Sequence, residues 1–330
     1  MLKIDIHTHI IPEKMPNWAE RFGYGGFISL DHHQPCCAKM MIDDQFFREI
    51  QSNCWDPETR ITECNHHHID VQVLSTIPVL FNYWAKPQDG LETARFFNDH
   101  IAQSCQLHPD RFIGLGTLPL QDIDLSIREL ERCMQSLQLA GIEIGSNING
   151  KNLSDPYFFP LWEAAERLNC SIFVHPWEMM GEDQMQRYWL PWLVGMPAET
   201  ARAISSMIFG GVFTKFPKLK VAFAHGGGSF PFTIGRIEHG FLVRPDLCAI
   251  DNEENPKNYL GKFWIDALVH DPKALTYIID TMGADKICMG SDYPFPLGEH
   301  HPGQLIESMP FDKQLKEQLL YKNALNWLGK

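Results

Sequence analysis

Four histidines and one aspartate occupy positions that suit metal-dependent chemistry. His7 and His9 are two residues apart, so an extended strand would present both imidazoles on one face. His175, His225 and Asp292 each stand at the end of a predicted strand much further along the chain. Imidazole and carboxylate ligands together suit a Zn²⁺-like cation that keeps one position open for water. Such a cation lowers the pKa of bound water, so this set predicts a catalytic site.

Other interpretations of these residues have to be weighed. A single histidine in a strand is more often an ordinary buried residue than a ligand. It is the recurrence at several strand ends that favours a metal site. A purely structural zinc ion is disfavoured because structural sites are usually rich in cysteine, and none of the five residues is a cysteine. From the residues alone, His225 could be one more imidazole ligand.

Alternating strand and helix signals show how these residues would be positioned. Including the first nine residues, eight apolar strand patterns occur, and most are followed by a helical segment. Eight such units in 330 residues predict one (β/α)8 barrel domain over 1–330, whose catalytic groups lie at the carboxyl ends of the strands. The competing open doubly wound sheet lacks a G-x-G-x-x-G motif after a strand. The other strands are expected at 71–76, 112–118, 141–145, 171–175, 219–225, 263–267 and 286–292.

Helix signals fill the gaps between the strands. Asp56 and Pro57 suit the start of a helix that runs to about residue 68, because aspartate caps a helix and proline fits its first turn. Asp155 and Pro156 repeat the pattern before a helix over 155–168. Further helices are expected over 90–108, 124–137, 198–215, 229–240, 272–282 and 312–328.

One connection is too long for an ordinary loop of a barrel. The stretch of about 10–53, after the first strand, is expected to be irregular and to form a small insertion over the barrel mouth. Arg48 lies within it, where a cationic side chain could hold an anionic substrate. An ordinary surface arginine is the competing interpretation of Arg48.

Composition excludes several classes of function. The net charge of −13 and the lack of any lysine- or arginine-rich run argue against nucleic-acid binding. Nine scattered cysteines without a C-x-x-C pair indicate reduced thiols, as in a cytoplasmic protein. No signal-peptide pattern opens the sequence, and no apolar run approaches the roughly 20 residues of a membrane span. We therefore expect a cytoplasmic enzyme without a nucleic-acid or membrane partner.

Eight longer motifs, spread over nearly the whole chain, carry a resemblance to a known family. They are Ile4-Asp-Ile-His-Thr-His9, Arg21-Phe-Gly-Tyr-Gly-Gly26, Cys54-Trp-Asp-Pro57, Val174-His-Pro-Trp177, Tyr188-Trp-Leu-Pro-Trp-Leu-Val-Gly-Met-Pro-Ala-Glu199, Phe223-Ala-His-Gly-Gly-Gly228, Pro231-Phe-Thr-Ile-Gly-Arg236 and Gly290-Ser-Asp-Tyr-Pro-Phe-Pro-Leu-Gly298. In these motifs the chain resembles the amidohydrolase superfamily, and within it the aminocarboxymuconate-semialdehyde decarboxylases.

The resemblance implies a role for each residue of the metal set. It implies one Zn²⁺ per subunit, held with a water by His7, His9, His175 and Asp292. It makes His225 a neighbour of the metal that activates this water as acid and base, so His225 and Asp292 are the expected catalytic residues. This assignment differs from the simpler one in which His225 is also a ligand.

The resemblance also implies a substrate and an assembly. The implied reaction is non-oxidative decarboxylation of 2-amino-3-carboxymuconate 6-semialdehyde, in tryptophan breakdown through the kynurenine pathway and away from quinolinate and NAD synthesis. Arg48 and Arg236 would bind the carboxylates of this dicarboxylate, with Trp192 and Phe295 beside it. Arg236 would reach in from the partner subunit of a homodimer. Without the resemblance, all four are ordinary helical, surface or core residues.

A hydrolase is the main competing function. Two-metal members of the superfamily bridge their ions with a modified lysine at the end of the fourth strand, where this chain has Gly141-Ile-Glu-Ile-Gly145. We therefore expect a mononuclear site. The same zinc-activated water would also serve a mononuclear lactonase or amidase, which stays open as the alternative.

Overall fold

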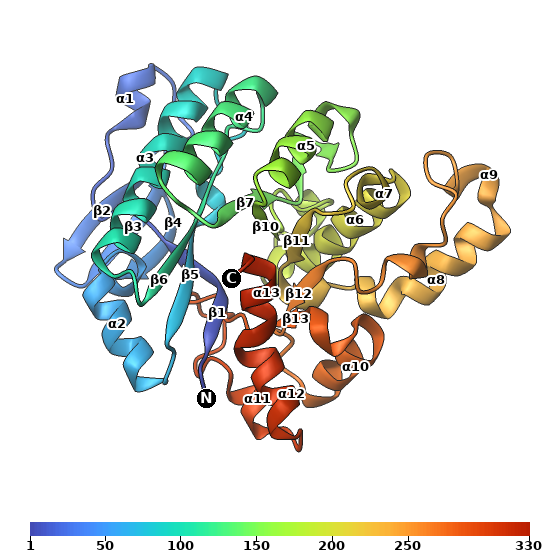
Figure 1. The fold of residues 1–330 in the computed structure, drawn as a ribbon. Coiled ribbons are helices and arrows are strands. Elements are labelled where there is room, and N and C mark those ends of the chain that lie inside the picture. Colours follow the sequence, from blue (N-terminus) through green and yellow to red (C-terminus); the bar gives the residue numbers. More distant parts are fainter.

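Eight parallel strands surround the centre of the molecule in the order β1-β5-β6-β7-β10-β11-β12-β13 (Figure 1). The computed structural model describes residues 1–330. Between β1 and the residues just after β13, Ile6 N donates to Met289 O at 3.0 Å and Asp292 N donates to His7 O at 2.9 Å. These bonds complete the ring, so the predicted (β/α)8 barrel is confirmed. The strands are β1 (Ile4–Ile10), β5 (Val71–Thr76), β6 (Phe112–Gly116), β7 (Gly141–Gly145), β10 (Ser171–His175), β11 (Lys220–Phe223), β12 (Trp264–Asp266) and β13 (Ile287–Cys288).

Helices cover the outside of this barrel (Figure 1). Asp56 caps α2, where its carboxylate accepts from Glu58 N and Thr59 N, as its position before Pro57 predicts. None of the helices is both long and apolar enough to cross a bilayer. The helices that follow the barrel strands are α2 (Pro57–His66), α3 (Pro87–Leu107), α4 (Ile123–Glu131), α5 (Phe159–Arg167), α6 (Met196–Phe209), α8 (Phe230–Val243) and α10 (Pro272–Met282). The others are α1 (Trp18–Phe22), α7 (Val212–Lys215), α9 (Pro245–Cys248), α11 (Gln304–Ser308), α12 (Lys313–Glu317) and α13 (Asn323–Leu328).

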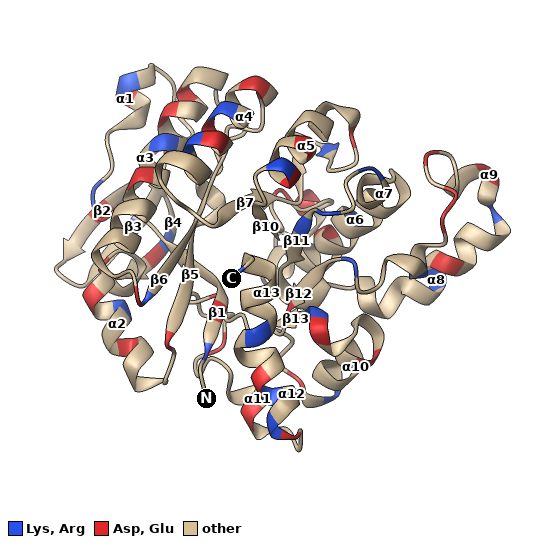
Figure 2. Cartoon of the chain, in the orientation of Figure 1, with Lys and Arg blue, Asp and Glu red and all other residues tan.

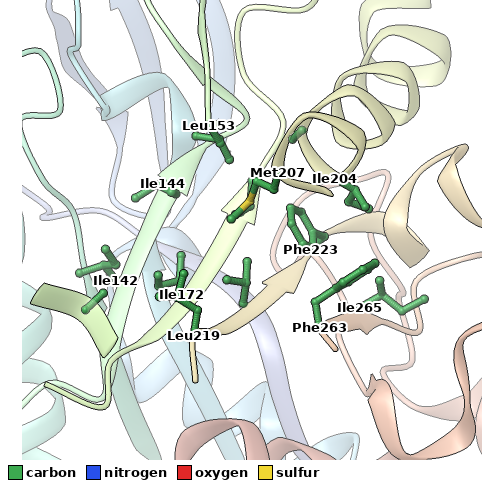
Figure 3. Close-up of a cluster of buried hydrophobic side chains, with 14 of the residues drawn as sticks. Ile142, Ile144, Leu153, Ile172, Ile204, Met207, Leu219, Phe223, Phe263 and Ile265 are labelled. Atoms are coloured by element: carbon green, nitrogen blue, oxygen red, sulfur yellow. The ribbon is translucent and has the colours of Figure 1, made fainter. Parts of the chain in front are cut away.

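Because side chains alternate along each strand, one face of the strands packs in the apolar core and the other face carries the residues of the site. On β10, Ile172 and Val174 belong to the large apolar cluster between strands and helices, together with Ile204 of α6 (Figure 3). Phe173 and His175 therefore point to the opposite side, into the barrel. The ring of Phe173 lies 4.8 Å from that of His7 between centroids, which places both inside. The apolar cluster thus holds the strands while their other face carries the chemistry.

The insertion after β1 is not irregular, contrary to the prediction. It contains the antiparallel sheet β2-β3-β4, with β2 (Ile28–Gln34), β3 (Cys37–Ile42) and β4 (Gln45–Gln51). The turn between β3 and β4 places Asp43 at φ 46° and Asp44 at φ 63°. Two left-handed residues define the tight hairpin turn that matches strand twist, and aspartate tolerates this conformation better than most residues. This sheet gives Arg48 a fixed position on β4.

Two predicted strands end earlier than expected, at the residues that matter most. β11 ends at Phe223 and β13 at Cys288, so His225 and Asp292 lie in the connections that follow. Both residues are left-handed, with φ 56° at His225 and φ 58° at Asp292, which an extended strand cannot contain.

The predicted helix over 198–215 is two helices, α6 and α7. Gly211 separates them at φ 67°, a left-handed conformation that ends a helix and that glycine adopts without steric cost.

Candidate metal centre and active site

All five residues predicted for the metal site lie together at the mouth of the barrel. His7, His175, His225 and Asp292 each offer one ligand atom, and these atoms lie within 4.8 Å of one another. His9 joins them, because its Nε2 lies 3.1 Å from Asp292 Oδ1. The same carboxylate lies 3.4 Å from His7 Nε2 and 3.8 Å from His225 Nε2. Asp292 is therefore the residue around which the four imidazoles gather.

Three of the imidazoles share one arrangement. Their Nε2 atoms are buried and have no hydrogen-bond partner, whereas their Nδ1 atoms face protein oxygens. A ring whose Nδ1–H is held in this way keeps the lone pair of Nε2 free, which is the usual state of a metal-binding histidine. The three Nδ1 pairs are His7 with Asp266 Oδ2 at 2.7 Å, His9 with Thr76 O at 2.9 Å and His175 with Pro176 O at 2.9 Å.

His225 is arranged differently from the other three. Its Nδ1 is buried without a partner, and its Nε2 is the atom that faces Asp292. Its side chain is 15% exposed, whereas those of His7 and His9 are fully buried. Backbone contacts fix its position, because His225 N donates to Asp266 Oδ2 at 2.9 Å. The ring thus has one nitrogen near the carboxylate and is partly exposed.

Charge coupling within the cluster is strong. Burial disfavours the charged form of His7, but Asp292 and Asp266 outweigh burial and raise the pKa of His7 to about 10. Burial and the neighbouring imidazoles hold the pKa of His175 well below its usual range. Although burial opposes ionisation of Asp292, the charge of His7 and the closeness of the other imidazoles hold its pKa well below the ordinary value. The cluster therefore favours a cation, either a proton on His7 or a metal ion.

The donor set fits a divalent metal. Three unpartnered imidazole nitrogens and one carboxylate are ligands that zinc and similar first-row metals bind in catalytic sites. The oxygens that hold the three Nδ1 atoms supply the outer contacts that such ligands need.

Three of the four predicted substrate residues line one cavity beside the metal cluster. Arg48, Trp192 and Phe295 face a space of about 50 Å³ together with His9, His175 and Asp292. The guanidinium carbon of Arg48 lies 4.8 Å from the centroid of the Phe295 ring and 5.8 Å from that of Trp192. Burial lowers the pKa of Arg48, so an anionic ligand would meet a poorly solvated guanidinium group.

A larger chamber of about 750 Å³ adjoins this cavity and shares Arg48, Trp192 and Phe295 with it. Its far side carries titratable groups, among them Glu63 and Glu299. Burial raises the pKa of Glu299 to about 7, and Gly303 N donates to its Oε2 at 2.8 Å. The two spaces therefore share aromatic residues, whereas Glu63 and Glu299 line only the larger one.

Arg236 is not part of this cavity. It lies on α8, a helix that projects from the barrel, and its side chain is exposed. The residues around both cavities do not include it.

Sequence reasoning missed two buried carboxylic acids of the site. Asp266, at the end of β12, holds the His7 ring and also accepts from His225 N and Gly226 N. Glu143 of β7 is fully buried with its Oε1 3.7 Å from His9 Nδ1, and burial raises its pKa well above the ordinary value. A signal was present for both, because a carboxylic acid within an apolar strand has to point into the barrel when its neighbours point to the helices.

Comparison with known proteins identifies the family. The sequence profile of the amidohydrolase family matches residues 4–330, and the chain belongs to this family. The chain is 63% identical over 329 residues to the 2-amino-3-carboxymuconate-6-semialdehyde decarboxylase of Dictyostelium discoideum, covering 99% of this chain and 92% of that one. The corresponding enzyme of Caenorhabditis elegans is 41% identical over 377 residues, covering 99% and 94%. The predicted enzyme class, a carboxy-lyase that cleaves a carbon–carbon bond, is confirmed.

Solved structures share the fold at lower identity. Metarhizium anisopliae IDCase in its apo form has a TM-score of 0.84 at 24% identity, covering 99% of this chain and 97% of that one. The dihydroxybenzoic acid decarboxylase of Polaromonas sp. JS666, solved with bound manganese and the inhibitor 2-nitroresorcinol, has a TM-score of 0.79 at 21% identity, covering 99% and 97%.

The raised pKa of Glu299 predicts a pH dependence of stability. The folded pKa of about 7 exceeds the ordinary 4.5, so the folded state holds an extra proton between these values. This contribution to stability is complete below about pH 4.5 and is lost as the pH rises towards 7. Glu299→Gln should remove the loss, so from pH 5 to pH 8 it should gain roughly 1–3 kcal/mol of unfolding free energy relative to the unmodified protein.

Urea denaturation at each pH measures this difference. Glu163→Gln, an exposed change on α5, is the control and should run parallel to the unmodified protein. If the unfolding free energy of Glu299→Gln also changed with pH in parallel with the unmodified protein, the raised pKa assigned to Glu299 would be contradicted.

Proposed function

We propose that this enzyme is a zinc-dependent decarboxylase of 2-amino-3-carboxymuconate 6-semialdehyde, with one Zn²⁺ per subunit. One observation carries the proposal: three unpartnered imidazole nitrogens and a carboxylate lie together, and two of these histidines and the carboxylate line a cavity that also holds an aromatic-stacked arginine. The identity to decarboxylases that carry this substrate's name supports the choice of substrate. On this proposal the enzyme acts in the cytoplasm, in the kynurenine pathway, and draws material away from quinolinate and NAD synthesis.

His7, His9, His175 and Asp292 are the proposed metal ligands. The held Nδ1 atoms of the three histidines support this choice, since they fix the rings with Nε2 towards the cluster. His225 has no such contact at Nδ1, although its ring is close enough to belong to the cluster. This difference favours His225 as the proton-transfer residue beside the metal.

The substrate's two carboxylates require cationic partners in a protein of net charge −13. Arg48 can grip one carboxylate with two parallel hydrogen bonds, as the planar guanidinium group allows. The rings of Trp192 and Phe295 hold that guanidinium and offer flat surfaces to the conjugated substrate. Arg48 therefore fixes which end of the substrate reaches the cluster.

The reaction replaces one substrate carboxylate by hydrogen and releases CO₂, so the site has to move a proton. A bound metal supplies an acidified water and an electrostatic partner for developing negative charge. His225 can accept a proton from the water as its hydroxide adds to the carbon next to the one that bears the departing carboxylate, because its ring is partly exposed beside Asp292. It can return this proton to the carboxylate-bearing carbon. Loss of CO₂ then re-forms the carbon–carbon double bond and expels the hydroxide, which takes up a proton from solvent, so that hydrogen replaces the carboxylate. Asp266 holds the His225 backbone in place during these transfers.

A mononuclear lactonase or amidase is the second candidate, because the same water would attack an ester or amide. Arg48 distinguishes the two, since a carboxylate clamp beside the metal suits an acidic substrate. Following the ultraviolet loss of the muconate semialdehyde beside lactone hydrolysis separates them directly.

The proposed homodimer rests on α8. Phe232, Leu242 and Val243 on this helix are 82%, 61% and 55% exposed, and Arg236 is exposed among them. Figure 2 shows fewer charged residues along α8 than along the shorter helix α4. An apolar, largely uncharged helix face is typical of a subunit interface. We propose that this face packs on a second copy and brings Arg236 to the substrate of the partner subunit.

His225→Ala should retain zinc and lose turnover. Removing a proton-transfer residue costs roughly 10²–10⁴-fold in rate, while the proposed ligands stay intact. CO₂ release and zinc content are measured on the same sample. His33→Ala, an exposed histidine of β2, is the control and should be unchanged in both. Near-normal turnover of His225→Ala with full zinc would exclude the proposed role.

Shared sites predict complementation between two inactive variants. An Arg236→Ala subunit keeps its metal residues and an His175→Ala subunit keeps Arg236, so a mixed dimer should contain one working site. Activity of verified mixed dimers measures this. Mixing His175→Ala with His225→Ala is the control, since every site then lacks one of these two histidines, and it should stay inactive. No recovery in the first mixture would contradict a shared site.

A further inference from the structure

Arg60 of α2 is an unusual residue for a helix outside a barrel. It is fully buried at 0% exposure, and its NH2 atom has no hydrogen-bond partner. Burying a cation costs free energy unless its hydrogen-bond donors find acceptors. The other donors of Arg60 find acceptors at the edge of the metal cluster: NH1 donates to His9 O at 2.7 Å, and Nε donates to Gln72 Oε1 at 3.2 Å.

The guanidinium group of Arg60 also meets the residue that follows Asp292. Its carbon lies 4.7 Å from the centroid of the Tyr293 ring. The hydroxyl of Tyr293 donates to Glu63 Oε2 at 2.6 Å, and Glu63 lies one turn after Arg60 on α2. The helix therefore holds Tyr293 twice, by a cation over the ring and by an acceptor at the hydroxyl.

The backbone of Asp292 needs the support that a firmly held Tyr293 gives it. Its φ of 58° is a conformation that side chains other than glycine, asparagine and aspartate rarely adopt, and it costs free energy that the surroundings must offset. This conformation turns the chain so that the carboxylate meets the imidazoles of His7 and His9. Asp292 N and Tyr293 O are fixed to β1, through His7 O at 2.9 Å and His9 N at 2.8 Å. Tyr293 is thus the direct continuation of the ligand loop.

The same pair on α2 holds the end of the insertion. Asn53 O accepts from Arg60 NH1 at 3.0 Å, and Asn53 Nδ2 donates to Glu63 Oε2 at 3.2 Å. Three segments far apart in the sequence therefore meet on two side chains: the end of β1, the loop after β13 and the last residues of the insertion.

We propose that Arg60 and Glu63 are positioning residues for the metal site, which hold Tyr293 and His9 so that Asp292 faces the three imidazoles. Neither side chain touches the imidazole rings or the Asp292 carboxylate, and Arg60 meets His9 only at its backbone oxygen, so their effect is on the geometry of the ligands. The inference rests on the proposed metal site and adds to it the device that orients the carboxylate ligand. Outer contacts of this kind change metal affinity by roughly 10–100-fold when they are removed.

Zinc affinity, measured by competition with a chromogenic chelator on the folded enzyme, tests this proposal. Arg60→Met keeps the length of the side chain and removes every hydrogen bond, so it should weaken zinc binding roughly 10–100-fold. Tyr293→Phe keeps the ring over Arg60 and loses only the bond to Glu63, so it should weaken binding by about threefold to tenfold. Glu63→Gln keeps an acceptor for the hydroxyl and should stay within about twofold.

A matched control separates positioning from general stability. Arg132→Met removes an arginine that is partly buried and binds Glu129 and Asp99 between α3 and α4, away from both cavities. It should lower the melting temperature while zinc affinity stays unchanged. If Arg60→Met does not fold, Tyr293→Phe and Glu63→Ala decide the question. Zinc affinity within twofold of the unmodified enzyme in these folded variants would overturn the proposal, whereas failure of the unmodified enzyme to bind zinc would instead overturn the metal site.

Discussion

The contact between one carboxylate and a group of buried imidazoles is the constraint on which the rest of the site depends. Asp292 lies within 3.4 Å of both His7 and His9, and these histidines are completely buried. A buried carboxylate without a cationic partner would be neutralised or would destabilise the fold. The cluster must therefore carry positive charge, as a proton or as a metal ion, and it has the ligand atoms for the metal. The proposed metal-dependent function follows from this requirement for positive charge.

The barrel and the segments around it contribute different residues to the proposed site. Strands β1 and β10 hold three of the four imidazoles, and the ring of parallel strands is packed on its outer face. The proposed substrate contacts come from added parts, with Arg48 on the inserted sheet and Arg236 on a helix that leaves the barrel. On this proposal the same metal cluster could serve different acids if the outer parts were altered.

The sequence predicted the barrel and the residues of the cluster, and particular elements show why. Strands such as β10 combine apolar residues with a histidine at the end, and helices such as α2 begin with a capping aspartate and a proline, so the signals are local. The inserted sheet was missed because its strands are mostly exposed and lack clear alternation, although the Asp43-Asp44 turn was a usable sign.

Other features of the site depend on distant contacts that no local pattern encodes. The left-handed backbone of Asp292 is stable only because β1 and α2 hold its neighbours. Arg60 reads in the sequence as an ordinary helical cation, and only the fold shows that it is buried beneath His9. Arg236 is exposed and lies outside the cavity of its own chain, a position that no local pattern encodes.

The most direct test of the account is the dependence of CO₂ release on bound metal. The enzyme is stripped with a chelator, zinc is returned in steps, and metal content and decarboxylation of 2-amino-3-carboxymuconate 6-semialdehyde are measured on each sample. The account predicts no turnover in the stripped protein, and activity that rises linearly and levels off at one zinc per subunit. Full turnover in protein shown to be free of metal would contradict it.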